Sequence, residues 1–226
     1  MAKLKWGMMA VDGRGKLGGH VLSKNRAGSY ARTKTTPTNP RTTFQMSVRG
    51  IFAAISSAWS ALTAAQRESF NGKVAEYATT DIFGDLRNPT GKNLYQRLNQ
   101  NLVNSGQAQV TTCPSPTDVP FSNLQGAAGD VSLNEITVSY NGDTTGSKVV
   151  FLATPPLSQG TKFVKNKLRQ LQVEDGANTD AVNIAASYVA RFGTFAAGDN
   201  IFVGVRVINA NGQASPIETV KANIVA

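Results

Sequence analysis

Residues 136–153 read ITVSYNGDTTGSKVVFLA and contain the clearest strand signals in the chain. Apolar and polar residues alternate from Ile136 to Tyr140, Asn141–Gly142–Asp143 is a turn sequence, and Lys148–Ala153 is rich in apolar residues. Alternation with a period of two is typical of a half-buried strand, and Asn-Gly is typical of a turn. We therefore expect two strands joined by a loop in this stretch.

Further strand signals continue to the C-terminus, in residues 163–173, 184–192, 200–208 and 218–225. Six or seven short strands separated by turn residues are typical of an immunoglobulin- or fibronectin-like β-sandwich. We predict such a sandwich over residues 130–226. It would be of the disulfide-free kind, because Cys113 is the single cysteine.

Residues 42–106 predict a small helical block. Thr42 or Thr43 can cap a first helix, Thr63–Gln66 has the form of a capping box that starts a second, and Thr90 can cap a third that ends at Gly106. Each predicted helix has an apolar stripe at spacings of three and four: Phe44, Val48, Ile51, Ile55, Trp59 and Leu62; Phe70, Val74 and Tyr77; and Leu94, Leu98 and Leu102. Residues 107–129, rich in Pro and Gly, predict a linker to the β region. The expected fold class is α+β.

The N-terminal segment carries the net charge of the chain. Residues 1–49 contain ten Lys or Arg residues and one acidic residue, Asp12, which gives +9 at pH 7, whereas 13 basic and 13 acidic residues cancel in the rest. Apolar residues follow no regular spacing here, and Gly, Thr, Asn and Pro are frequent. Such a segment buries too little apolar surface to offset its ordering entropy. We predict an extended basic arm over residues 1–41 that becomes ordered on a partner.

The arm interleaves its charges with aromatic side chains that can anchor a partner's pocket. The expected partner-binding residues are Trp6, Arg14, Lys16, Lys24, Arg26, Tyr30, Arg32, Lys34 and Arg41. A positive segment of this kind suits an acidic protein surface or nucleic acid. Because fixed glycines and aromatics accompany the charges, we favour a protein surface over nucleic acid.

Motifs for catalysis and cofactors are weak. Gly13–Gly18 matches G-x-G-x-x-G, but no strand–helix context or acidic residue about twenty positions on supports a dinucleotide site. His20 is the single histidine, so a zinc site or a Ser-His-Asp triad would lack partners. Asp81 and Asp85 fit a solvated turn, and Cys113 fits a bystander thiol. We expect no catalytic, cofactor-binding or metal-binding residues, and hence no enzyme.

Targeting signals are also lacking. No apolar run reaches the 18 residues of a transmembrane helix, and the apolar stretch near the N-terminus is interrupted by Gly7 and stops at Asp12. We expect no secretory signal, no membrane contact, and synthesis in a reducing cytoplasm.

One resemblance rests on the arm, in residues 16–30, Arg32–Thr33–Lys34 and 37–42, which follow the pattern GKxGG…SxNRxGxYxR…PxNPxT. With residues 58–67 and 93–102, these segments resemble a group of proteins of tailed bacteriophages and prophages. The chain is more distantly similar to arm-plus-sandwich proteins of crAss-like phages. The resemblance covers residues 1–105 and implies a virion structural component.

These observations together predict an auxiliary (cement or decoration) capsid protein, made in the host bacterial cytoplasm, present in multiple copies or as a homo-oligomer in the virion. Its expected partner is the major capsid protein or another virion protein. A neck, portal-vertex or tail-ring protein is the alternative within the structural class. A packaged nucleic-acid-binding protein is the alternative from another class.

Overall fold

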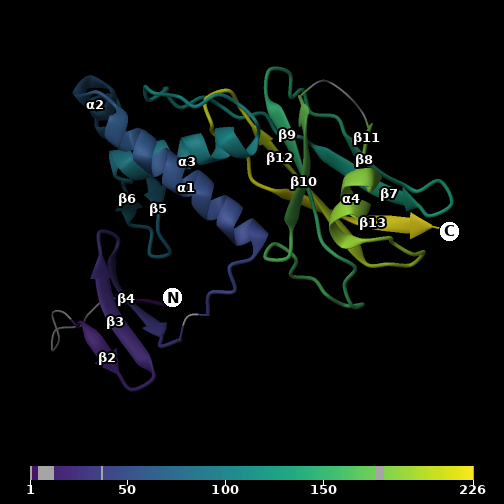
Figure 1. Cartoon of the computed structure of the whole chain (residues 1–226), viewed down its shortest axis with the longest axis horizontal. Helices are drawn as coiled ribbons and strands as arrows, with labels where there is room; N and C mark the ends of the chain where they lie inside the picture. The colour runs from purple at the N-terminus through teal and green to yellow at the C-terminus, as the bar shows by residue number, and fades with distance from the viewer. Residues whose placement is uncertain (1, 5–12, 37, 177–180, 226) are drawn as a thin grey trace. The chain divides into compact units, whose positions relative to one another are not determined.

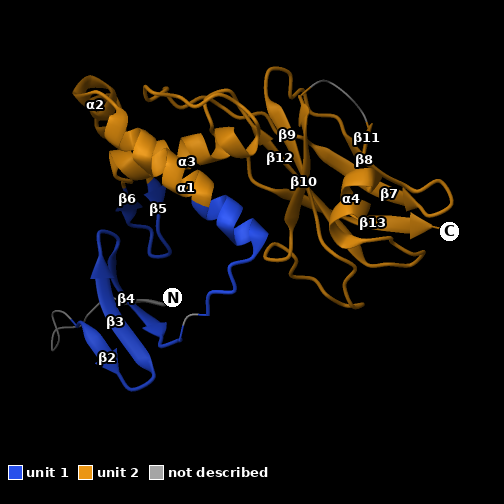
Figure 2. Ribbon diagram, viewed as in Figure 1, with its two compact units in different colours: residues 1–49, 79–87 blue, residues 50–78, 88–226 orange. Residues whose placement is uncertain are grey.

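The computed structural model describes residues 2–4, 13–36, 38–176 and 181–225 and shows an α+β protein (Figure 1). This confirms the expected fold class. Contacts between residues divide the chain into two compact units. One comprises residues 1–49 with 79–87, and the other residues 50–78 with 88–226 (Figure 2). Among the described residues, no single helix has the length and apolar character of a membrane span; only α1 and α2 taken together reach it, and they are bent by 111°.

The first unit contains a four-stranded antiparallel sheet. Its strand order is β1-β4-β3-β2, with bounds β1 (Ala2–Leu4), β2 (Gly15–Leu17), β3 (His20–Asn25) and β4 (Gly28–Thr33). The N-terminal arm was expected to run extended along a partner. Instead its strands fold back and satisfy one another's backbone groups.

Two short turns make this folding back possible. Leu17 pairs with His20 across Gly18–Gly19, where Gly18 has φ of 56°. Asn25 pairs with Gly28, which has φ of 105°, and the Asn25 side-chain oxygen accepts a hydrogen bond from the Ala27 amide at 2.9 Å. Gly18 supplies positive φ inside its two-residue loop, whereas in the second turn the loop residues have no positive φ and Gly28 supplies it at the end of the turn. Gly18 and Gly28 therefore allow the chain to turn back on itself.

Three helices follow, with bounds α1 (Thr43–Ala61), α2 (Ala64–Gly72) and α3 (Gly91–Asn104), close to the predicted positions. The capping box of α2 is formed: the Gln66 amide donates to Thr63 Oγ1 at 3.2 Å, and the Thr63 amide donates to Gln66 Oε1 at 2.9 Å. Thr90 caps α3, and Gly106 follows it with φ of 73°. These local predictions are confirmed. Between α2 and α3 lies the hairpin of β5 (Thr79–Thr80) and β6 (Leu86–Arg87).

The helices of the second unit share an apolar cluster. Its centre is an aromatic triangle in which the ring centroids of Trp59, Phe70 and Tyr95 lie 5.2–5.9 Å apart. The fully buried Ile55, Leu94 and Leu98 surround it. Edge-on aromatic packing and burial of this kind stabilise three short helices that would be marginal alone.

A seven-stranded mixed sheet forms the C-terminal part, in the order β10-β9-β12-β13-β7-β8-β11. All neighbours are antiparallel except β13 and β7, which are parallel. The strand bounds are β7 (Leu124–Asp130), β8 (Glu135–Tyr140), β9 (Lys148–Ala153), β10 (Arg169–Asp175), β11 (Ala181–Asn183), β12 (Ile201–Ile208) and β13 (Glu218–Val225).

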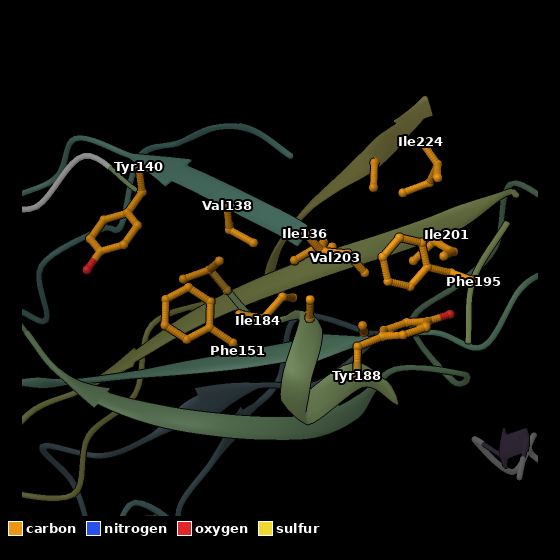
Figure 3. Packing of buried hydrophobic residues seen from close by; sticks show 14 of the residues in the cluster. Ile136, Val138, Tyr140, Phe151, Ile184, Tyr188, Phe195, Ile201, Val203 and Ile224 are labelled. Atoms are coloured by element: carbon orange, nitrogen blue, oxygen red, sulfur yellow. The ribbon is translucent and has the colours of Figure 1, made fainter. Parts of the chain in front are cut away.

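The sheet curls into a half-barrel around helix α4 (Ala185–Phe192). This helix contacts both β10 and β8, near opposite edges of the sheet, and Arg191 donates to the Gln170 carbonyl at 2.8 Å. Tyr188, on α4, is fully buried among strand side chains (Figure 3). The helix thus fills the concave face and provides the core that a second sheet would provide in a sandwich.

Three predictions about the β region differ from the structure. The expected immunoglobulin- or fibronectin-like sandwich is replaced by a single sheet, because β7 joins β13 and connects all seven described strands. The strand expected at residues 184–192 is instead α4 (Ala185–Phe192), since Ala185, Tyr188 and Phe192 recur at helical spacing. The expected linker, 107–129, contains most of β7, whose Gly- and Ala-rich sequence gives little strand signal.

Candidate functional site

The candidate site is the basic sheet of the first unit. Four of the partner-binding residues predicted from the sequence lie on its strands: Lys16 on β2, Lys24 on β3, and Tyr30 and Arg32 on β4. The others lie beside the strands: Arg14 before β2, Arg26 in the β3–β4 turn, Lys34 after β4, and Arg41 before α1. Trp6 lies outside the described residues.

Strand register separates these side chains into two faces. Lys16 pairs with Val21, Val21 with Arg32, and Ser23 with Tyr30, so these five residues share one face. This surface, Lys16–Val21–Ser23–Tyr30–Arg32, is named the Tyr30 face below. The opposite face holds Leu17, His20, Leu22, Lys24 and Ala31. The sheet therefore brings Lys16, Tyr30 and Arg32 together and places Lys24 on the other side.

The sheet buries few side chains in the part whose burial the structure describes, residues 13–36. Of residues 13–36, only Ser29 is buried, and Leu17 on the second face is 68% exposed. Arg14, Lys16, Lys24, Arg26, Arg32 and Lys34 are exposed, whereas Tyr30 is half-buried. Residues 13–36 contain no Asp or Glu. Such a surface attracts carboxylates or phosphates, and Tyr30 adds an aromatic contact.

The N-terminal half of α1 adds an apolar surface that the sequence did not predict to be exposed. Phe44, Val48 and Phe52 continue the helix stripe, but they are 64%, 61% and 52% exposed, whereas Ile55 on the same stripe is 1% exposed. From Ile51 onward, the stripe of α1 belongs to the apolar cluster that the three helices share. The sequence pattern identified the stripe correctly, but the stripe is longer than the part that the described residues cover.

Side chains considered for catalysis adopt structural roles. Cys113 is buried, and burial raises the pKa of its thiol, which keeps it in the neutral form. The Asp81 carboxylate accepts hydrogen bonds from the Phe83 and Asp85 amides, at 2.7 and 3.3 Å, as expected for a turn. Within the described ranges, no three His, Cys, Asp or Glu residues gather as metal ligands.

Compared with known proteins, the chain matches no family model, no curated protein and no solved structure.

Proposed function

We propose that this protein is a structural component of a tailed-bacteriophage virion, an auxiliary (cement or decoration) capsid protein whose basic N-terminal sheet docks on the shell. One observation carries the proposal: the first unit is a charged sheet with only Ser29 buried in residues 13–36. A sheet that buries so little gains its stability from a surface that covers it. The resemblance of the arm to phage and prophage proteins supplies the context.

The charge and the apolar residues of this segment indicate what would cover it. Residues 1–49 carry +9, which steers the segment toward an acidic surface. The exposed Phe44, Val48 and Phe52 require apolar contacts as well, and nucleic acid offers few of these outside its stacked bases. A protein partner provides both, so the major capsid protein is the proposed partner.

Deletion of residues 1–41 tests this proposal. The truncated protein keeps α1–α4 and the seven-stranded sheet, and we expect it to fold but to be missing from purified particles of the encoding phage. Circular dichroism of the free variant provides the folding control. Normal occupancy of the truncated protein on particles would overturn the proposal.

Copy number separates the location on the capsid from the alternative, a neck, portal-vertex or tail-ring protein. Quantitative mass spectrometry of purified virions measures it against the major capsid protein. A decoration protein follows the number of capsid subunits, whereas a ring protein is present as a single closed ring. A number of copies equal to one ring per particle would instead support a location in the neck or tail.

The second candidate function is a packaged nucleic-acid-binding protein. It is favoured by the Tyr30 face, where an aromatic ring shares one face of the sheet with Lys16 and Arg32 and with no acidic residue among 13–36. Phosphate contacts and base stacking use this combination. Titration of the full chain with duplex and single-stranded DNA tests it. Tight binding that persists at about 0.2 M salt would favour this function, because affinity from phosphate contacts alone falls steeply with salt.

A further inference from the structure

A cavity of about 330 Å³ is lined entirely by residues of the second unit. Arg97 and Asn101 line it from α3, Arg206 from β12, and Gly212 and Gln213 from the loop that joins β12 to β13. Its volume is near the lower end of the range for small-molecule sites, ~300–1,000 Å³. No acidic side chain lines it.

The wall of the cavity is held in place by hydrogen bonds. Asn101 Nδ2 donates to the Gly212 carbonyl at 2.8 Å. Gln213 Oε1 accepts from the amide and hydroxyl of Thr117, at 3.0 and 2.9 Å, and from Asn209 Nδ2 at 3.2 Å. These donors fix which side of the Gln213 amide is the oxygen. Its nitrogen donates no hydrogen bond to the described residues and is left for a ligand.

Arg206 is the unusual group in the cavity wall. It is half-buried on β12, and its Nε has no hydrogen-bond partner among the described residues. Burial lowers the pKa of this guanidinium, which reflects the cost of desolvating its charge. The described residues also provide no ion pair for it. A buried, unsatisfied Nε on a half-buried cation costs free energy unless an anion or another acceptor binds it.

Arg97 contributes a second guanidinium to the same cavity. Its Cζ lies 5.4 Å from the centroid of the Tyr77 ring, and this cation–π contact holds it without using a carboxylate. The Tyr77 hydroxyl itself donates to the Pro114 carbonyl at 3.1 Å. Arg97 is exposed, and the described residues provide no acceptor or carboxylate for its guanidinium, so its donors remain available to a ligand in the cavity.

We propose that this cavity binds the oxyanion group, carboxylate or phosphate, of a small molecule. Two arginines and a glutamine line it, and guanidinium forks match both oxyanions in charge and geometry. The site is independent of the proposed virion function, since its lining residues belong to the second unit.

The test is a titration of the ¹⁵N-labelled full chain, followed by two-dimensional NMR. The probes are sodium phosphate and sodium citrate, each compared with sodium chloride at equal ionic strength. We expect saturable shifts of the Gly212 and Gln213 amides with at least one probe. Saturation by phosphate alone assigns a phosphate ligand, and saturation by citrate alone assigns a carboxylate ligand. No saturable shift with either probe would overturn the proposal.

Variants tie the binding to the two arginines. Arg206→Met and Arg97→Gln should each weaken binding at least about tenfold, since each removes charge-assisted hydrogen bonds. Arg67→Gln is the matched control, because Arg67 is exposed on α2 and does not line the cavity. Arg97 lies on the exposed surface of α3, so Arg97→Gln still tests the proposal if Arg206→Met does not fold. Equal affinity of Arg97→Gln and the unmodified chain would show binding elsewhere and overturn the proposal.

Discussion

Asn101 on α3 donates a hydrogen bond from Nδ2 to the carbonyl of Gly212, 2.8 Å away and 111 residues later in the chain. Gly212 has φ of 78°, and a Cβ atom built on it would lie 2.5 Å from the Leu98 carbonyl oxygen. The β12–β13 loop therefore lies directly against the backbone of α3. This contact joins the helical cluster to the curled sheet within the second unit.

Gly212→Ala should destabilise the protein by about 2–4 kcal/mol, because a side chain there is strained by positive φ and also meets the backbone of α3. Gly198→Ala is the matched control: Gly198 has φ of 82°, and its Cβ would meet nothing within 4 Å. This control variant should lose only the stability that corresponds to the strain of an alanine at positive φ, about 1–2 kcal/mol. Urea unfolding measures both. Equal losses would show that α3 and the loop separate easily.

Removal of the hydroxyl group should change the free energy of unfolding differently at two buried tyrosines. The Tyr188 hydroxyl is buried without a hydrogen-bond partner among the described residues, so Tyr188→Phe should leave the free energy of unfolding unchanged or raise it slightly. The Tyr77 hydroxyl donates to the Pro114 carbonyl, so Tyr77→Phe should cost about 1 kcal/mol. Urea unfolding of both variants tests this. A larger loss for Tyr188→Phe would contradict the assignment of its environment.

Alkaline pH should destabilise the second unit. Burial raises the pKa of Tyr77 from 10.0 to about 12, so the unfolded chain loses this proton before the folded one does. The stabilisation that this shift represents is complete below pH 10.0 and is lost as pH rises toward about 12. Urea midpoints measured across this range should fall, and less steeply for Tyr77→Phe. The same slope in both proteins would exclude a contribution from Tyr77.

Signals carried by adjacent residues predicted the structure well. The Thr63–Gln66 capping box, the Thr90 cap and Gly106 placed the starts of α2 and α3 and the end of α3, because each acts through hydrogen bonds or φ within a few residues. The strands at 136–140 and 148–153 followed from period and composition.

Features set by distant residues were missed. β7 is stabilised by parallel pairing with β13, which begins 94 residues further along the chain, and its own sequence shows nothing of this. α4 was read as a strand because its apolar residues also fit a short apolar run. Arg97 and Arg206 lie 109 positions apart, so sequence spacing alone gave no reason to pair them.

Trypsin should cut the free protein first after Lys34 and Arg41. Residues 34–36 and 38–42 have no helix or strand, and Lys34 and Arg41 are exposed. Cleavage there releases the sheet strands and leaves a fragment that starts near α1. The bond after Arg191 is the internal control, since it lies within α4 against the core. Cleavage at Arg191 as fast as at Lys34 would contradict the prediction that the segment before α1 is the most accessible.

Lys16, Arg32 and Lys24 together distinguish a specific protein contact from a general charge effect. Removal of any of them lowers the net charge by one, but Lys16 and Arg32 share the Tyr30 face and Lys24 lies on the opposite face. If the Tyr30 face binds a virion protein, Arg32→Ala should lower occupancy on particles about tenfold in competition with the unmodified protein, and Lys16→Ala should act in the same direction. Arginine contacts in an interface cost more than ~1 kcal/mol on truncation, whereas a charge outside it costs little.

Lys24→Ala is therefore the matched control and should change occupancy by less than about twofold. Tyr30→Phe adds a second readout, because it keeps the ring and removes only the hydroxyl; a stacked ring should tolerate it, whereas a hydrogen-bonded phenol should not. Nucleic-acid binding predicts a different pattern, since phosphate contacts depend mainly on the number of cations. Equal losses for Lys16→Ala, Lys24→Ala and Arg32→Ala would reject a face-specific protein contact and favour the packaged nucleic-acid-binding alternative.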